Sequence, residues 1–335
     1  MLPTHIILVN IGSPDAPDPQ SVARYLRHFL GDPRVIDIHP WLRWLLVNLL
    51  VVPRRAALSA HAYQQIWTKD GSPLVVHSKN FATKLQAYWG EDVRVYPAML
   101  NGHPSVHDVI NSCIDEGAQR LVIVPMFPQS ASATTGAAWD AATSVLRTRA
   151  EALSDVHFVG PFSDHPGFIE PFATSIRETM VQSGAEHLLM SYHGLPMRQL
   201  KCACSDVRAG CPRSQDNTCY RSQCYGTSRA LMSALSLDDT QITIAFQSRL
   251  GRAAWIEPYT EASLAPLRAR GIKSLAVVCP SFVADCLETL EEVGMRLRAS
   301  WLGLGGEHLH LVPCPNANGA WVQGFATIIE KRGLR

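Results

Sequence analysis

Short apolar runs of strand length alternate with helix-length segments along the 335-residue chain, and this alternation constrains the fold more than any other feature. The runs expected to form strands are residues 5–10, 93–99, 120–126 and 156–159, and then 187–192, 242–247, 274–279 and 308–312. Continuous apolar strands that alternate with helices indicate parallel sheets covered on both faces. The sequence therefore predicts an α/β protein with two such sheets.

A cluster of turn-forming residues, GPFSDHPG, follows the fourth run and places the domain boundary near residue 160. We expect a first domain over residues 1–160, a second over 161–317, and a final helix within 318–335. No sequence repeat relates the two halves.

Charge and terminal patterns narrow the class of protein. Thirty basic residues against twenty-nine acidic ones leave a formal charge of +1, so no strong field is available to attract nucleic acid. The N-terminus lacks a basic segment with a small-residue cleavage site, which predicts a cytoplasmic protein. The longest apolar run, residues 41–52, is too short to span a bilayer. It is expected either to lie on a membrane surface or to form a buried helix.

Ligand sites of parallel sheets lie beyond the carboxyl ends of the strands, so the residues that follow each run are informative. His193 follows the run 187–192, Trp255 comes shortly after 242–247, and Phe282 follows 274–279. A histidine at this position suits catalysis near neutral pH, although such histidines are also ordinary rim residues.

An acidic segment follows the third run of the second half. Asp285, Glu288 and Glu292 stand at i, i+3 and i+7, so on an α-helix they line one stripe. Such a stripe can hold or pass a divalent cation, or it can simply complement the helix dipole.

Several long motifs together resemble the ferrochelatases of haem biosynthesis. They are ILVNIGSPDAP with RYLRHFLGDPRVID, YQQIWTKDGSPL, PQSASATTG, SYHGLP, QSRLGRAAWIEPYT and CPSFVADCLETLEE, and they cover nearly the whole chain. The resemblance implies two Rossmann-like domains, each with a four-stranded parallel sheet flanked by helices, and a porphyrin cleft between them. It also implies the reaction, which is insertion of Fe(II) into a porphyrin. The apolar run 41–52 is similar to the family's apolar lip, which would contact the inner membrane peripherally.

The resemblance also implies roles for individual residues. It assigns catalysis and Fe(II) binding to His193 and Glu288, and an iron path to Asp285 and Glu292. The residues that it places against the porphyrin are Ile11, Tyr192, Trp255 and Phe282. A neutral imidazole accepts protons and binds iron reversibly, and carboxylates bind Fe(II) without trapping it. Whether His193 accepts protons or delivers iron stays open at this point.

Two positions depart from the family pattern. Cys286 stands where some relatives have histidine, and it is interpreted as a small apolar filler rather than an iron ligand. Many relatives carry an Arg-Tyr pair where this chain has Leu100 and Asn101, which puts one porphyrin contact in doubt.

Five cysteines lie within residues 201–224, in a segment that resembles an insertion. Cys202, Cys204, Cys211 and Cys219 form a C-x-C-x6-C-x7-C pattern, and Cys224 follows as a bystander or a substitute ligand. In a reducing cytoplasm such clusters are more often metal ligands than disulfides. Four thiolates suit a [2Fe-2S] cluster, which several ferrochelatases carry, with structural zinc as the alternative.

Three alternatives to a protoporphyrin IX ferrochelatase remain open. They are a coproporphyrin III ferrochelatase, a cobaltochelatase of cobalamin synthesis, and a haem- or iron-binding redox sensor without activity. The sequence indicates no oligomeric state.

Overall fold

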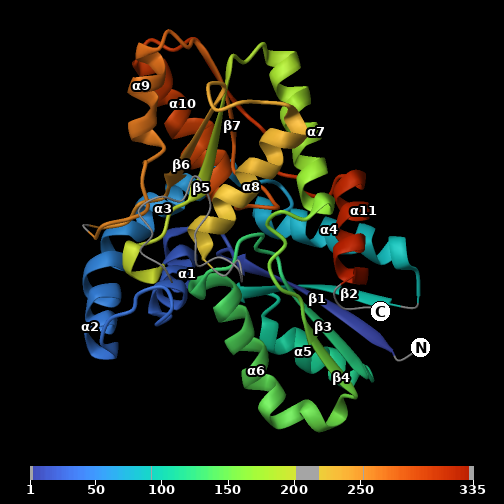
Figure 1. Cartoon of the computed structure of the whole chain (residues 1–335). Coiled ribbons are helices and arrows are strands. Elements are labelled where there is room, and N and C mark those ends of the chain that lie inside the picture. The colour runs from blue at the N-terminus through green and yellow to red at the C-terminus, as the bar shows by residue number, and fades with distance from the viewer. Residues whose placement is uncertain (1–2, 92, 201–218, 252, 332–335) are drawn as a thin grey trace. The chain divides into compact units, whose positions relative to one another are not determined.

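The computed structural model describes residues 3–91, 93–200, 219–251 and 253–331. These residues form two compact units, shown in Figure 1. The first contains the described residues of Met1–Phe127, Ala131–Gly160 and Ala326–Arg335, and the second those of Pro128–Ser130 and Pro161–Phe325. The main division falls after Gly160, and the C-terminal helix contributes residues to both units.

The first unit is built on a four-stranded parallel sheet with the order β2-β1-β3-β4. Its strands are β1 (Thr4–Gly12), β2 (Val93–Asn101), β3 (Arg120–Pro125) and β4 (Asp155–Phe158). Apart from the edge residues, the side chains of β1 and β3 are buried, as expected for a parallel sheet covered on both faces.

Helices fill most of the rest of the first unit. They are α1 (Pro19–Gly31), α2 (Pro40–Leu45), the π-helix η1 (Leu46–Val51), α3 (Val52–Ile66), α4 (Pro73–Trp89), α5 (Val106–Asp115), the π-helix η2 (Ser132–Gly136), α6 (Ala137–Arg149) and the short η3 (Ala150–Ala152). Local sequence explains where several begin. Asp18 accepts hydrogen bonds from the main-chain N–H groups of Gln20 and Ser21, and Pro19 opens α1 with a suitable φ.

One face of the first sheet packs against α5 and α6. Ile7 and Val9 of β1 share a buried cluster with Ile110 of α5 and Val145 of α6. The residues of β1 that enter this cluster are two apart, which is the period of a strand.

The second unit contains another four-stranded parallel sheet, with the order β6-β5-β7-β8. Its strands are β5 (His187–His193), β6 (Ile242–Gln247), β7 (Ser274–Val278) and β8 (His308–Leu311). All eight expected strands are therefore confirmed, together with the α/β class and the two parallel sheets.

Helices flank this sheet as well. They are α7 (Pro166–Ser183), η4 (Met197–Gln199), α8 (Tyr220–Leu235), η6 (Glu261–Ser263), α9 (Leu264–Ala269), the π-helix η7 (Glu288–Leu297), α10 (Arg298–Gly303) and α11 (Gly319–Ile329). Leu189 of β5 shares a buried cluster with residues of α9, η7 and α10, such as Leu267, Val293 and Trp301. Tyr192 of β5 instead bonds to Ser228 of α8, on the opposite face of the sheet.

Two glycines allow α7 and α11 to approach closely. A Cβ atom added to Gly167 would lie 2.2 Å from the carbonyl oxygen of Gly324, and one added to Gly324 would lie 2.1 Å from that of Gly167. Any larger residue at either position would force the two backbones apart.

We searched the helices of the described residues for membrane spans. None of them combines the length and the apolar character that crossing a bilayer requires.

Candidate functional site

His193 is the last residue of β5, and its half-buried side chain is held in one orientation. Its ring nitrogen Nδ1 lies 2.7 Å from the carbonyl oxygen of Gly194. Because a carbonyl only accepts hydrogen bonds, Nδ1 carries the proton in the neutral ring, and Nε2 keeps its lone pair. The ring also meets Phe282, with a centroid distance of 6.2 Å and an interplanar angle of 64°. Nε2 is thus the atom available to accept a proton or to bind a metal.

Tyr192 lies on the other face of the sheet, because successive side chains of a strand alternate. It is 0% exposed, and its hydroxyl pairs with Ser228 Oγ at 2.8 Å. The expectation that Tyr192 contacts a porphyrin is therefore wrong for this conformation. The period of two explains why it cannot share a surface with His193.

The acidic segment forms a π-helix rather than an α-helix from Glu288 onward. Hydrogen bonds in a π-helix run from i to i+5, so the turn is wider than in an α-helix. The stripe expected from spacings of three and seven residues is therefore wrong in its geometry. Glu288 and Glu292, four residues apart, remain neighbours on η7.

Glu292 lies close enough to Glu288 and His193 for their charges to change its pKa. Burial raises the pKa of Glu292, hydrogen bonding from Ser248 opposes that rise, and the nearby charge of Glu288 adds to it. A protonated His193 acts in the opposite direction and lowers the pKa of Glu292. The structure thus brings together three of the predicted catalytic and iron-path residues.

Asp285 is bound to a segment that lies far away in the sequence. It precedes the helix and is 6% exposed, and its carboxylate is already engaged. Thr289 Oγ1 donates to its Oδ1 over 3.0 Å, and Asn316 Nδ2 donates to its Oδ2 over 2.7 Å. Asp285 thus precedes η7 and is not part of a helical stripe, and its side chain ties the start of η7 to the segment after β8. Its role in the iron path stays a prediction.

Gln247 and Ser248, at the end of β6, hold η7 in place. Gln247 Nε2 donates to the main-chain oxygen of Glu288 over 2.9 Å. Ser248 donates to both carboxylate oxygens of Glu292, from its main-chain nitrogen over 2.9 Å and from its hydroxyl over 2.7 Å. Its φ of +65° is unusual for a residue other than glycine. Sequence reasoning gave these residues no role, although their position at a strand end was a usable signal.

Trp255 lies beside the start of the loop that follows His193. A Cβ atom added to Gly194 would lie 3.2 Å from Cε3 of the Trp255 ring. Main-chain hydrogen bonds from Met197 to Ala254 and from Ile256 to Leu195 keep the two segments together. The structure thus groups Trp255 and Phe282 with His193.

Ile11 belongs to the first unit, where it lies near the end of β1. Its main-chain nitrogen donates to Asn10 Oδ1 over 2.8 Å, and its carbonyl accepts from Asn101 Nδ2 over 3.2 Å. Asn101 in turn pairs with His28 through its Oδ1 and the ring nitrogen Nδ1, at 2.7 Å. The departure from the family pattern at Asn101 is thus a buried polar residue that supports the backbone of Ile11.

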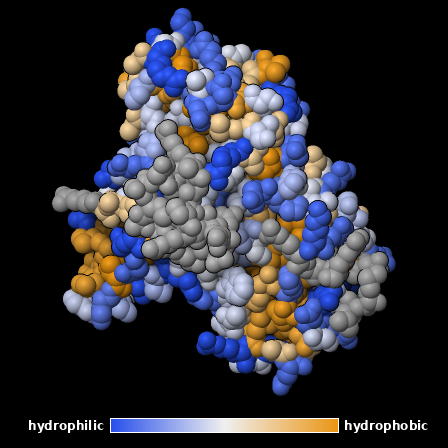
Figure 2. Space-filling view, viewed as in Figure 1, coloured by the Kyte–Doolittle hydropathy of each residue, from blue (hydrophilic) through white to orange (hydrophobic). Residues whose placement is uncertain are grey.

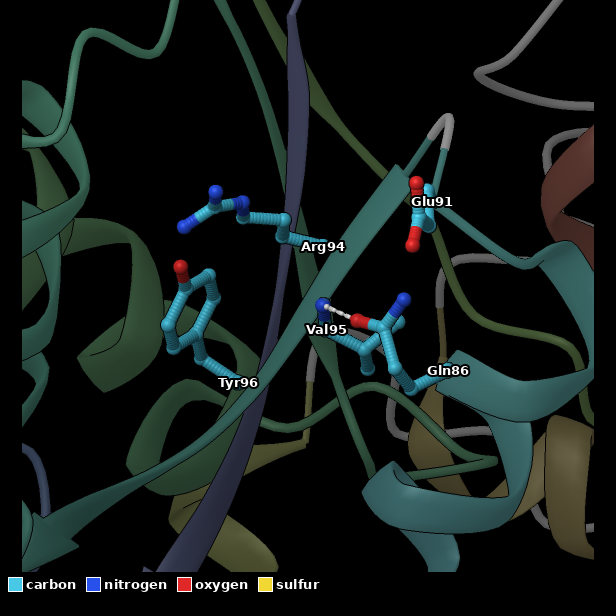
Figure 3. A pocket seen from close by; sticks show the side chains of 5 residues that line it. All are labelled: Gln86, Glu91, Arg94, Val95 and Tyr96. Carbon is cyan, nitrogen blue, oxygen red and sulfur yellow. Dashed lines mark hydrogen bonds between the residues drawn. The ribbon is translucent and has the colours of Figure 1, made fainter.

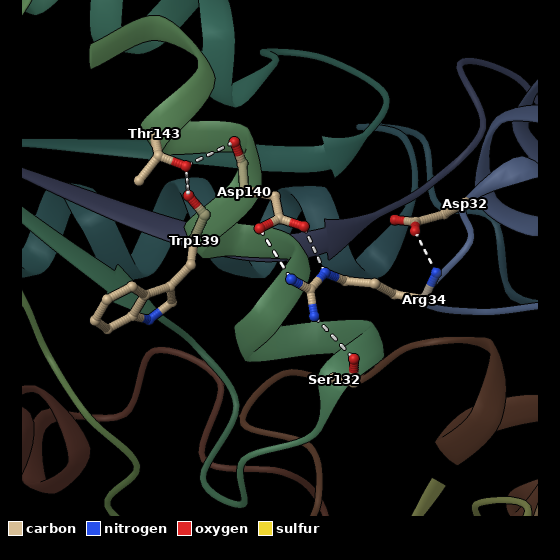
Figure 4. Close-up of polar contacts among 6 residues, drawn as sticks. All are labelled: Asp32, Arg34, Ser132, Trp139, Asp140 and Thr143. Atoms are coloured by element: carbon tan, nitrogen blue, oxygen red, sulfur yellow. Dashed lines mark hydrogen bonds and ion pairs between the residues drawn. The ribbon is translucent and has the colours of Figure 1, made fainter. Parts of the chain in front are cut away.

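A second polar cluster of the first unit lies at the start of α6 (Figure 4). Arg34 donates to both carboxylate oxygens of Asp140, over 2.5 and 2.9 Å, and to Ser132 Oγ over 2.9 Å. The guanidinium holds the pKa of Asp140 below its ordinary value. This cluster connects the turn after α1 to η2 and α6.

A pocket of about 530 Å³ lies along the edge strand β2, far in sequence from the predicted site residues (Figure 3). It is lined by Gln86, Glu91, Arg94, Val95 and Tyr96. Gln86 accepts from the nitrogen of Val95 over 2.9 Å and donates to the oxygen of Val93 over 2.7 Å. Its side chain therefore caps the open edge of the sheet, and the pocket contains none of the predicted catalytic groups.

The apolar run 41–52 forms α2 and η1 and exposes large side chains. Trp41 is 58% exposed and Trp44 is 59% exposed, and Leu42, Leu45, Leu49 and Leu50 are also exposed. Figure 2 shows this apolar surface in orange at the left of the view, over α2. Val47 is buried against Leu30 and Ala56 and anchors the segment. The alternative of a fully buried helix is wrong.

Cys202, Cys204 and Cys211 lie outside the described residues, whereas Cys219 and Cys224 lie within them. Cys219 is buried at the residue that precedes α8. Burial raises the pKa of the Cys224 thiol well above its ordinary value. Because a bound metal itself deprotonates a coordinating thiol, the donor chemistry of Cys219 and of Cys224 fits a thiolate-bound centre, and the choice between them stays a prediction. Among the described residues, no group of three or more His, Cys, Asp or Glu side chains is arranged to hold a metal ion.

Comparison with known protein families and sequences gives a consistent result. The family model described as ferrochelatase matches residues 3–333. The ferrochelatase of Coxiella burnetii (strain Dugway 5J108-111) is 40% identical, over 97% of this chain and 93% of its own. That of Legionella pneumophila (strain Lens) is 40% identical, over 98% of each chain.

Solved structures with the same fold include two forms of SirB. SirB from Bacillus subtilis with Fe3+ gives a TM-score of 0.54 at 11% identity, covering 99% of this chain and 96% of its own. The sirohydrochlorin chelatase SirB from Bacillus subtilis subspecies spizizenii, in complex with cobalt, gives a TM-score of 0.54 at 10% identity over the same shares. At this level of identity the likeness concerns the fold alone.

Proposed function

Because the chain belongs to the ferrochelatase family and is a metal chelatase of haem biosynthesis, we propose that it inserts Fe(II) into protoporphyrin IX and releases two protons. The match to ferrochelatases over nearly the whole chain carries this proposal. The grouping of His193, Glu288 and Glu292 on one side of the second sheet supplies the residue types that the reaction needs.

His193 is the proton acceptor in this proposal. The porphyrin must lose two pyrrole protons before all four of its nitrogens can bind iron, and His193 takes them one at a time, passing each to solvent before it accepts the next. Nε2 of His193 carries the free lone pair, since Nδ1–H donates to the carbonyl oxygen of Gly194. The neighbouring carboxylates stabilise the imidazolium that forms when His193 takes a proton.

Glu288 and Glu292 provide oxygen ligands for the approaching Fe(II). Carboxylates bind this ion weakly enough to release it, whereas a set of thiolates would retain it. Asp285 is proposed to continue the iron path, since its oxygens, like those of Glu292, keep lone pairs beyond the hydrogen bonds that they accept.

Trp255 and Phe282 are the porphyrin contacts proposed for the second unit, and Ile11 is the one proposed for the first. Apolar and aromatic side chains favour a flat ligand with few charged groups. Protoporphyrin IX carries fewer carboxylates than coproporphyrin III, so these side chains favour protoporphyrin IX as the substrate.

The exposed segment 41–52 is proposed to rest on the surface of the inner membrane, with the protein on the cytoplasmic side. Trp41 and Trp44 have the amphipathic rings that favour the membrane interface. A porphyrin dissolved in the membrane would then be available to the enzyme.

Cys202, Cys204, Cys211 and Cys219 are proposed to bind a [2Fe-2S] cluster. The spacing of the four cysteines supports this assignment. Such a cluster would act as a structural or sensory group, because metal insertion needs no electron transfer.

The substrate proposal is tested by anaerobic steady-state assays of the purified protein with Fe(II) and each porphyrin. We expect kcat/KM for protoporphyrin IX to exceed that for coproporphyrin III by about tenfold or more. The opposite preference would reject the proposed substrate. Faster insertion of Co(II) into sirohydrochlorin would identify a cobaltochelatase, and binding without turnover would identify a sensor.

The cluster proposal is tested by the colour and metal content of the protein purified without oxygen. We expect a red-brown protein whose iron and acid-labile sulfide are present in equal amounts and are lost in Cys219→Ser. A colourless protein that holds zinc at these cysteines would contradict the proposal.

A further inference from the structure

We propose that Tyr220 and Ser281 are positioning residues that hold the main chain of His193 in the geometry needed for metal insertion. This inference rests on the role proposed above for His193. It concerns two residues that sequence reasoning left without a function.

Hydrogen bonds connect these two side chains to both main-chain polar groups of His193. Tyr220 donates its hydroxyl to the carbonyl oxygen of His193 over 2.7 Å. The main-chain nitrogen of His193 donates to Ser281 Oγ over 3.3 Å. The two hydroxyl oxygens, of Tyr220 and Ser281, lie 3.1 Å apart and are bonded to each other. The two side chains thus engage both main-chain polar groups of one residue, His193, and we call this pair of hydroxyls the bracket.

The register of the sheet explains why such a bracket is needed. Strand β7 ends at Val278, which is paired with Met190, three residues before His193. On the other side, β6 continues to Gln247, which lies opposite His193 and accepts a hydrogen bond from the nitrogen of Gly194 over 2.8 Å. Main-chain groups of adjacent residues in a strand point to opposite sides. Those of His193 therefore point toward the side where β7 has already ended.

Tyr220 and Ser281 thus replace the missing strand partner of His193. Ser281 comes from the segment just after β7, and Tyr220 is the first residue of α8. Without them, the end of β5 would have lateral support from one neighbour only. The ring of His193 would then be free to move with its backbone.

The burial of Tyr220 makes the bracket rigid. The side chain is 8% exposed, so a lost hydroxyl is not easily replaced by water. A buried donor of fixed direction suits a positioning role, because small displacements of a reacting group reduce rates strongly.

The test compares Tyr220→Phe with Ser228→Ala as a matched control. Both variants remove a buried hydroxyl of α8, but Ser228 bonds to Tyr192 and Cys224 rather than to His193. We expect Tyr220→Phe to lower kcat for Fe(II) insertion about tenfold while KM for the porphyrin stays within about twofold. Ser228→Ala is expected to lower the melting temperature with kcat unchanged. Equal kcat values for the two variants would overturn the proposal.

Ser281→Ala provides a second route if Tyr220→Phe does not fold. It is expected to lower kcat in the same way, and the double variant is expected to be no slower than the slower single variant, because the two hydroxyls act as one unit. Fully additive losses would show that the hydroxyls act separately and would reject the bracket.

A readout that does not depend on turnover separates this inference from the role of His193. Nitrogen NMR of 15N-histidine-labelled protein, assigned with His193→Ala, reports which ring nitrogen carries the proton. We expect Nδ1–H in the wild type and in Ser228→Ala, and a mixture of tautomers in Tyr220→Phe. An unchanged His193 signal in Tyr220→Phe would reject the positioning role. Retained metal insertion in His193→Ala would reject only the catalytic role of His193.

Discussion

In both units the first strand of the sheet along the chain lies between the second and the third. β1 lies between β2 and β3, and β5 lies between β6 and β7. A glycine stands at the end of β1 and another directly after β5. Each glycine lies against the last residue of a neighbouring strand. A Cβ atom on Gly12 would lie 1.7 Å from the oxygen of Asn101, and one on Gly194 would lie 2.8 Å from the oxygen of Gln247.

The two halves differ in the side chains placed at these equivalent positions. Ile11 precedes the glycine of the first unit, and His193 precedes that of the second. The third strand of each sheet is followed by a π-helix, but η2 carries no carboxylate, whereas η7 carries Glu288 and Glu292. The two sheets thus have equivalent strand ends, but only those of the second unit carry a histidine followed in space by the two carboxylates to which we assign function.

The largest expected effect is on catalysis. His193→Ala should lower kcat about a hundredfold or more, because it removes the proposed proton acceptor. Ile11→Ala, at the equivalent position of the first unit, should raise KM for the porphyrin about fivefold and leave kcat within about twofold, because it removes only apolar contact. Steady-state assays without oxygen measure both. Similar losses of kcat in the two variants would show that the two strand ends do not differ in function.

The two glycine crossings should differ in their effect on stability. Gly12 has a φ of +99° and would place Cβ against a backbone oxygen, so Gly12→Ala should lower the free energy of unfolding by about 3 kcal/mol or more. Gly194→Ala should cost about half as much, because its φ is not positive and its contact is less severe. Thermal unfolding followed by circular dichroism checks the order. A larger loss in Gly194→Ala would contradict it.

Ionisation of Glu292, in the second unit, should destabilise the folded state as the pH rises. Burial raises the pKa of Glu292 above its ordinary value of 4.5, so ionisation is penalised in the folded state. The stability of the wild type relative to Glu292→Gln should therefore be greatest below the ordinary pKa and should decline as the pH rises through the raised one. Urea unfolding at a series of pH values measures this difference. A difference that does not vary with pH would show that Glu292 has an ordinary pKa.

A carboxylate of the first unit should show the opposite pH dependence with a smaller amplitude. Arg34 lowers the pKa of Asp140, so the pair stabilises the fold above the ordinary pKa of Asp140, and this contribution is lost as the pH falls through the lowered value. The pair is largely exposed, so Asp140→Asn should cost less than about 1 kcal/mol at neutral pH, and less still in high salt. The same urea series with Asp140→Asn tests the sign.

The sequence predicted the strands and their ends well, because apolar runs and turn residues are local signals. Placing His193 at the end of β5 required only the rule that ligand sites follow the strands of parallel sheets. Two sequence predictions were wrong: the porphyrin contact of Tyr192 and the α-helical stripe of the acidic segment. The period of two already separated Tyr192 from His193, and the α-helical period did not anticipate the π-helix that begins at Glu288.

Other features could not be found from local patterns, since they depend on residues far apart in the chain. In the sequence Asp285 is one more acid of a helical stripe, and only its contact with Asn316, thirty-one residues away, reveals that it anchors the start of η7. Tyr220 and Ser281 are similarly ordinary in sequence, and they act on His193 from distances of 27 and 88 residues.

The sequence by itself determined the fold class, the family and the location of His193, because these follow from periodicity and from motifs that can be read along one strand or one helix. Only the tertiary structure decided that Glu288 and Glu292 lie near His193 and that Tyr220 bonds to its main chain. It also decided that Tyr192, an expected porphyrin contact, lies in the core. The physical reason is that burial and hydrogen bonding are properties of neighbours in space. In a parallel sheet, those neighbours come from segments that the chain reaches only after a full crossover.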